Sequence, residues 1–158
     1  MTTPSWAQRR APLAVRLLIG LFGVGALLFN VALMMSDRAP GITRRIFGGF
    51  AERLADRLDA SGTVDAADLP GNDAIVHIGV WAVATLLVVL TIWRWAALLP
   101  VAVGIFVASV FVEIGQGRYS SSRAVEFSDV LANAVGVALG AGGAVACMAV
   151  WSAVSRVA

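Results

Sequence analysis

The segment Val112–Gly140 has the sequence VEIGQGRYSSSRAVEFSDVLANAVGVALG, and it indicates the fold more clearly than any other part of the chain. It connects the end of one long apolar run to the start of the next. Its polar residues and glycines follow the pattern Glu113-x2-Gln116-x6-Arg123-x2-Glu126-x2-Asp129-x3-Asn133-x2-Gly136-x3-Gly140. Charged and amide side chains at the ends of membrane helices are costly unless they have partners. We therefore expect two neighbouring membrane helices whose polar ends form a common site.

The composition indicates a membrane protein. Apolar residues make up 59% of the 158 residues, charged residues only 14%, and the mean hydropathy is +0.83. A soluble domain of this size could not cover its surface with so few polar side chains. Four apolar stretches reach the length of a membrane span, and we place them at residues 13–35, 74–93, 96–116 and 129–152. The sequence thus predicts one all-α domain over residues 1–158, an integral membrane bundle of four transmembrane helices.

A further helix is predicted between the first two spans. Apolar side chains recur there every four residues, and charged side chains occupy most of the remaining positions. The recurring positions are Ile42, Ile46, Phe50, Leu54 and Leu58. We expect an extracytoplasmic amphipathic helix at about 42–60 that lies in the membrane interface or caps the bundle.

The distribution of charge predicts the orientation of the bundle. The N-terminal arm, the turn around Arg94 and the C-terminal tail contain arginines and no acidic residue. All ten acidic residues lie in the other two connections and the helix ends beside them. Cytoplasmic connections are enriched in basic residues, so we expect a multi-pass protein of the cell membrane with both termini in the cytoplasm. Trp6, Trp93, Trp95 and Trp151 all fall on that predicted face, as in an interfacial aromatic belt.

Charge, cysteine content and motifs argue against several classes of function. The net charge is only +2, so the pI of about 9.5 does not indicate a nucleic-acid partner. Cys147 is the single cysteine, which excludes an intramolecular disulfide and a multi-cysteine metal site. His77, Glu113 and Asp129 are a conceivable set of metal ligands, but no dense metal-binding motif supports it. We expect no metal and no cofactor.

Polar residues at matched depth predict a binding site. His77 lies 16 residues, and Glu113 and Asn133 each lie 18 residues, from a tryptophan at the other end of the same helix. At 1.5 Å per residue these separations are roughly 24–27 Å, which brings all three to the outer hydrocarbon boundary. The full set of candidate ligand-binding residues is Asp73, His77, Glu113, Gln116, Arg123, Asp129 and Asn133.

Two motifs of the chain resemble the VanZ-like family of bacterial membrane proteins. One is Asp73-Ala74-Ile75-Val76-His77, and the other is the Glu-x2-Gln…Arg…Asp-x3-Asn-x2-Gly pattern of residues 113–136. Ala74 stands where the family has a Lys, and Ile78 stands where Phe is common. The resemblance covers residues 73–140 and the number of spans. It implies a multi-pass membrane protein with cytoplasmic termini that is linked to the cell envelope and to glycopeptide resistance.

The charged candidates can be given roles by their chemistry. His77 has the only side chain whose unperturbed pKa lies near neutrality, so it is the natural proton donor or acceptor. Asp73, one helical turn away, could orient or charge it. Glu113 and Asp129 would need a counter-charge if they are buried. Arg123 is the candidate partner, or else a clamp for a phosphate or carboxylate.

The amide and glycine positions complete the predicted arrangement. Gln116 and Asn133 would extend an internal network of the carboxylates and the arginine. Gly136 and Gly140, spaced by four residues, allow a neighbouring helix to pack closely. We expect these glycines to serve packing and not catalysis.

Three hypotheses for the function follow from the sequence. The first is binding of an amphipathic cell-envelope ligand, such as a lipid-linked cell-wall precursor or a glycopeptide, at the outward polar cluster. The second is a membrane enzyme that acts on a lipid or isoprenoid head group, with His77 and Glu113 as acid and base. The third is a structural bundle without a ligand. A membrane lipid or lipid-linked precursor is the expected partner, and the sequence leaves the oligomeric state open.

Overall fold

A computed structural model of the chain describes residues 10–34, 49, 53, 57, 72–119 and 127–155. All regular structure within these ranges is helical, so the predicted all-α fold class is confirmed. The elements are α1 (Leu13–Met34), α3 (Asn72–Ile92), the short 3-10 helix η3 (Trp95–Ala97), α4 (Leu98–Tyr119) and α5 (Phe127–Val154). Each of the four long helices coincides, within a few residues at either end, with one of the predicted apolar stretches.

Three of these helices are long and apolar enough to cross a membrane. The qualifying segments are Ala74–Ile92, Trp95–Gly115 and Phe127–Val154. In α1 the apolar segment among the described residues is Leu13–Phe29, which is shorter, so the fourth predicted span stays a prediction. Of the predicted amphipathic helix at 42–60, Gly49, Arg53 and Arg57 are described and helical, and its other positions lie outside the described residues.

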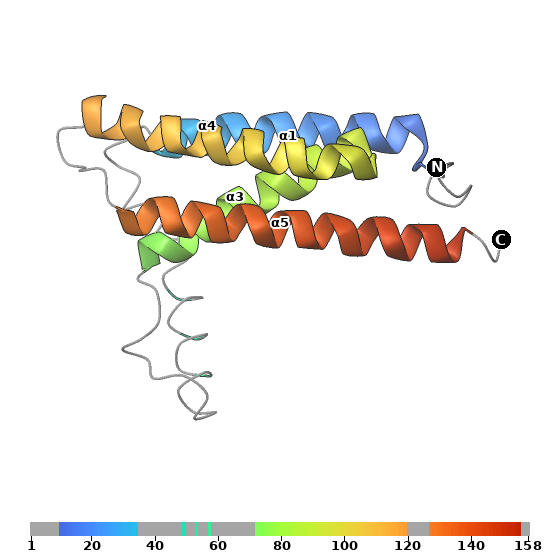
Figure 1. Cartoon of the computed structure of the whole chain (residues 1–158). Helices are drawn as coiled ribbons and strands as arrows, with labels where there is room; N and C mark the ends of the chain where they lie inside the picture. The colour runs from blue at the N-terminus through green and yellow to red at the C-terminus, as the bar shows by residue number, and fades with distance from the viewer. Residues whose placement is uncertain are drawn as a thin grey trace.

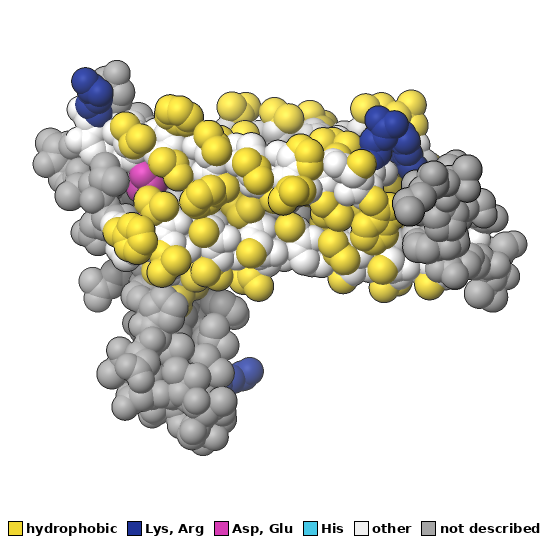
Figure 2. Space-filling model, viewed as in Figure 1, with side chains coloured by type: hydrophobic (Ala, Val, Ile, Leu, Met, Phe, Trp, Pro, Cys, Tyr) yellow, Lys and Arg dark blue, Asp and Glu magenta, His cyan; other side chains and the backbone are white. Residues whose placement is uncertain are grey.

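The four long helices alternate in direction, so the start of α1 and the end of α5 lie at the same end of the bundle (Figure 1). We call this the terminus end, and the opposite end, where α3 and α5 begin and α4 stops, the loop end. In Figure 1 α3 crosses obliquely between the other helices. Apolar side chains cover most of the bundle face shown in Figure 2, and charged side chains are seen on the bundle itself only near its two ends. This is the surface that a lipid environment requires.

The core of the bundle is the seam between α3 and α5. A Cβ atom on Gly136 would lie 2.5 Å from the carbonyl oxygen of Ile78, and one on Gly140 would meet the carbonyl oxygen of Ala82. The two backbones therefore touch, and only glycine fits at both positions. The predicted close packing at Gly136 and Gly140 is confirmed. Further along α5, the seam continues with the buried residues Ala144, Met148 and Ser152.

The terminus end is closed by aromatic side chains. Trp93 follows α3 in a left-handed conformation with φ of 53°, which costs a non-glycine residue about 1–2 kcal/mol. Trp93 is 8% exposed, and its ring packs edge-on against Trp151 at a centroid distance of 6.1 Å. Burial of the ring offsets the backbone strain. Trp93 and Trp151 thus share one end as predicted, but Trp93 is a core residue and not a lipid-facing member of an aromatic belt.

Arg16 of α1 holds the C-terminal end of α3. Its Nε donates to the carbonyl oxygen of Thr91 at 2.8 Å, and its Nη2 donates to that of Ile92 at 3.0 Å. Helix C-termini leave their last carbonyl oxygens without intrahelical partners, and a cation also complements the helix dipole there. This contact fixes the position of α1 along α3.

We expect Arg16→Leu to lower the free energy of unfolding by about 1.5–3 kcal/mol, the range for hydrogen bonds to a charged group. Arg16→Lys, which keeps the charge but lacks the two-pronged donor geometry, should recover only part of the loss. Denaturation by sodium dodecyl sulfate in detergent micelles measures both. An Arg16→Leu variant as stable as the unmodified protein would show that the contact does not anchor α1.

Candidate functional site

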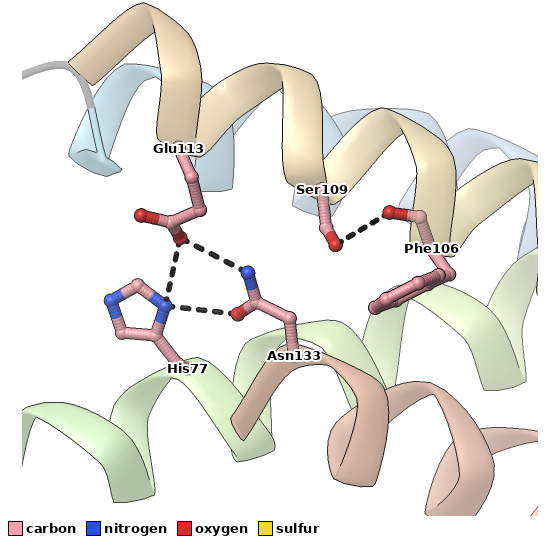
Figure 3. Close-up of polar contacts among 5 residues, drawn as sticks. All are labelled: His77, Phe106, Ser109, Glu113 and Asn133. Carbon is pink, nitrogen blue, oxygen red and sulfur yellow. Dashed lines mark hydrogen bonds and ion pairs between the residues drawn. The ribbon is translucent and has the colours of Figure 1, made fainter. Parts of the chain in front are cut away.

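Three buried polar side chains from three different helices meet near the loop end. Nδ1 of His77 on α3 lies 2.9 Å from Oδ1 of Asn133 on α5. Nδ2 of Asn133 donates to Oε1 of Glu113 on α4 at 3.0 Å, and Oε1 lies 3.3 Å from His77 Nδ1. The side chains form a closed triangle of polar contacts (Figure 3). Of the predicted convergence of His77, Glu113, Gln116, Arg123, Asp129 and Asn133, the contacts among His77, Glu113 and Asn133 are confirmed, and we call these three residues the triad.

The triad is closed off from its surroundings. His77 and Asn133 are 0% exposed and Glu113 is 1% exposed. Burying these groups in an apolar bundle is unfavourable unless they bond to one another, so their mutual contacts explain how the helices tolerate them. The glycine seam places the partners, because Gly136 lies on α5 one turn after Asn133 and its contact, Ile78, directly follows His77. The same close approach of α3 and α5 therefore brings His77 to Asn133.

The second ring nitrogen of His77 is the exception in this network. Its Nε2 is buried and has no hydrogen-bond partner among the described residues. In Figure 3, Nε2 points away from Asn133, and one carboxylate oxygen of Glu113 lies on the same side. Glu113 follows Phe106 and Ser109 along α4, so this side faces the loop end. More than nine in ten buried polar groups in proteins are hydrogen-bonded, which makes an unmatched imidazole nitrogen a sign of a missing partner.

The other candidate residues are placed less completely. Asp129, in the first turn of α5, is half-buried and interacts electrostatically with His77. The side chains of Asp73 and Gln116, and the whole of Arg123, lie outside the described residues. Their predicted roles, including the pairing of Arg123 with Glu113 or Asp129, stay predictions. The described residues contain no group of three His, Cys, Asp or Glu side chains placed to hold a metal ion.

Two residues near the triad were not predicted to belong to the site. Trp81 lies one turn after His77 on α3, is 1% exposed, and its Nε1 also has no hydrogen-bond partner in the described part of the chain. Ser109 lies one turn before Glu113 on α4, and its hydroxyl donates to the carbonyl oxygen of Phe106 at 2.7 Å. Both stand at i±4 from a triad residue, so helical spacing alone could have assigned them to the same faces.

An apolar groove runs beside the triad on another face of α3. It lies between α1 and α3 near the loop end and has a volume of about 350 Å³. Its lining includes Val76 and Gly79, which flank His77 along the helix, and its other lining residues are Ala26, Phe29, Ile75, Val80 and Val83. The groove could hold an apolar chain within reach of the polar end of α3.

Comparison of the chain with protein-family models, with curated proteins and with solved structures finds no match in any of the three.

Proposed function

We propose that this chain is a VanZ-like multi-pass protein of the cell membrane that binds an amphipathic cell-envelope ligand through the triad at its loop end. The ligand would be a lipid-linked cell-wall precursor or a glycopeptide, which links the protein to envelope homeostasis or glycopeptide resistance. One observation carries the proposal: His77 is held rigidly by two partners while its buried Nε2 has none in the described part of the chain. A histidine kept for helix packing alone would have no reason to bury an unsatisfied nitrogen.

The amphipathic character of the ligand follows from what lies next to the triad. A polar head group would bond at the loop end of α3, where His77 Nε2 points. The groove between α1 and α3 would take the apolar chain of the same molecule, because its lining is almost wholly aliphatic or aromatic. Binding sites that combine an apolar cavity with a few placed polar groups are the usual form of small-molecule sites.

The proposal requires the loop end to face outward and both termini to lie in the cytoplasm. The test is labelling of single cysteines with a membrane-impermeant thiol reagent in intact cells, in a Cys147→Ser background because Cys147 is exposed. We expect Ser61→Cys and Ser121→Cys to label and Ser155→Cys to be protected. The reverse pattern would place the site on the cytoplasmic side and would contradict an envelope ligand.

Native mass spectrometry of the purified protein tests the binding function. We expect a lipid-linked molecule to co-purify with the unmodified protein and to be lost, by tenfold or more in occupancy, from His77→Gln. The matched control is Ser152→Ala, since Ser152 is also buried but bonds to the carbonyl oxygen of Met148 within its own helix, far from the loop end. Equal occupancy in both variants would favour the structural bundle without a ligand.

A second candidate function is supported by the contact between His77 and Glu113. A carboxylate that holds Nδ1 of a histidine while Nε2 faces the reactant is the arrangement that orients a general base. The enzyme hypothesis thus assigns proton transfer on a lipid or isoprenoid head group to His77, with Glu113 behind it. The two functions are separated by incubating the protein in vesicles of native lipid and measuring the masses of the lipids afterwards by mass spectrometry. A head-group change that requires His77 favours the enzyme, and unchanged bound lipid favours binding alone.

A further inference from the structure

We infer that Asn133 and Glu113 fix His77 in the tautomer that carries its proton on Nδ1, so that Nε2 presents a lone pair to a hydrogen-bond donor of the ligand. The ligand part of this inference rests on the proposed binding function, and the tautomer part does not. Asn133 is in this view a positioning residue, because it acts on the ligand only through the imidazole ring.

The hydrogen-bond directions within the triad determine the tautomer. An amide oxygen can only accept, so the 2.9 Å contact with Asn133 Oδ1 requires a proton on His77 Nδ1. The amide is itself oriented by its donation to Glu113 Oε1 at 3.0 Å. Oε1 also lies 3.3 Å from Nδ1, which gives the same proton a second acceptor. Both neighbours of Nδ1 thus accept, and in the neutral ring the lone pair lies on Nε2.

The reverse arrangement is conceivable only with a protonated carboxyl. Turning the amide of Asn133 by half a turn would place two acceptor oxygens face to face unless Glu113 carried a proton. The amide nitrogen would then donate to Nδ1, and the ring proton would move to Nε2. The two arrangements therefore differ in which ring nitrogen is protonated, and this difference can be measured directly.

The tautomer defines the chemical class of the ligand group. Besides the Nε2 lone pair, one carboxylate oxygen of Glu113 lies on the same side of the ring, and Asp129 interacts electrostatically with the ring from α5. These groups accept hydrogen bonds or carry negative charge. A head group that donates, through a hydroxyl or an ammonium group, complements them, whereas a head group without a donor leaves Nε2 unsatisfied.

The single histidine of the chain makes the measurement unambiguous. The protein is labelled with ¹⁵N-histidine and placed in nanodiscs of phosphatidylcholine, whose head group has no hydrogen-bond donor. The ¹⁵N spectrum is recorded at rising pH until the ring is neutral. We expect Nδ1 to be protonated and Nε2 to be unprotonated. Protonation of Nε2 in the neutral ring, or of both nitrogens up to alkaline pH, would overturn the inference.

Variants test the part played by Asn133. In Asn133→Leu we expect a mixture of the two tautomers, because only the longer contact to Glu113 remains. Ser109→Ala is the matched control, since its hydroxyl bonds within α4, and it should leave the spectrum unchanged. An unmixed Nδ1–H tautomer in Asn133→Leu would show that Asn133 does not position the ring. If this variant does not fold, the spectrum of the unmodified protein still decides the tautomer.

A change of lipid tests the ligand class separately. Nanodiscs with phosphatidylglycerol supply a hydroxyl donor, and those with phosphatidylethanolamine supply an ammonium donor. We expect the Nε2 resonance to shift in one or both of them relative to phosphatidylcholine, and the shift to become smaller in Asn133→Leu, where only part of the protein keeps the lone pair on Nε2. An unprotonated Nε2 that responds to neither head group would uphold the tautomer and refute the donor ligand. Co-purification of a lipid that lacks donors would refute only the ligand class and leave the proposed binding function standing.

Discussion

Gly140→Val is expected to be among the most damaging single substitutions in the chain. A Cβ at this position would meet the carbonyl oxygen of Ala82 and would lie 2.8 Å from Cβ of Thr85. Backbone cannot move aside as a flexible side chain can, so α3 and α5 would have to separate. Overpacking of this kind costs about 3 kcal/mol, the upper end of the usual range. Because the seam also brings His77 to Asn133, the variant should lose ligand together with stability.

The control for this prediction lies two residues further along the same helix. Gly142 is exposed, and a Cβ added there meets nothing within 4 Å. Gly142→Val therefore makes the same chemical change without a clash and should alter the free energy of unfolding by less than about 0.5 kcal/mol, as surface substitutions usually do. Denaturant titration in micelles compares the two. Equal stability of Gly140→Val and Gly142→Val would contradict the close packing of α3 on α5.

Removing both His77 and Glu113 should cost less stability than the two single removals added together. Glu113→Ala or His77→Ala leaves a buried partner without its bond, and a buried donor or acceptor left unsatisfied costs about 1–3 kcal/mol, more when it is charged. In the double variant neither His77 nor Glu113 remains to be left unsatisfied, so its loss of stability should be smaller than the sum of the two single losses. Ser109→Ala, on the same face of α4, should cost about 1 kcal/mol, since it removes one hydrogen bond within its own helix.

The two single variants and the double variant form a double-mutant cycle. Additive losses of stability in this cycle would mean that His77 and Glu113 do not interact, despite the 3.3 Å between Nδ1 and Oε1. A cycle with strong coupling but unchanged lipid occupancy in the single variants would assign the triad to structure alone. The coupling in stability therefore tests whether the network exists, and the lipid occupancy tests whether the network is needed for binding.

The positions of the helices follow from the sequence because hydropathy over about twenty residues is a strong signal. The helices extend slightly beyond the predicted spans where polar residues continue the same backbone, as at Arg118 and Tyr119 at the end of α4. The left-handed backbone at Trp93 could not be foreseen, since no glycine or asparagine marks the turn. Burial of its ring against Trp151 is a tertiary effect that local sequence does not contain.

The membership of the site was partly predictable for a similar reason. Counting residues from the tryptophans placed His77, Glu113 and Asn133 at a common depth in the membrane. Because turning a polar side chain toward lipid is costly, all three were expected to point into the bundle. Depth does not give the lateral order of helices, however. From charge alone, Arg123 was the candidate partner of Glu113 and Asp129, and Asn133 was expected to extend that network through its amide. In the structure Asn133 contacts both other members of the triad, because Gly136 brings α5 onto α3 at that level.

The central claim is that the triad binds a ligand, and ligand-induced stabilisation tests it most directly. A ligand that binds only the folded protein raises its stability in proportion to the logarithm of its concentration, by about 2.7 kcal/mol at a hundredfold excess over Kd. Delipidated protein and its His77→Gln variant are titrated with the total polar lipids of the source membrane while thermal unfolding is followed. The account predicts a concentration-dependent rise in Tm for the unmodified protein and little or none for His77→Gln. An equal rise in both proteins would contradict it.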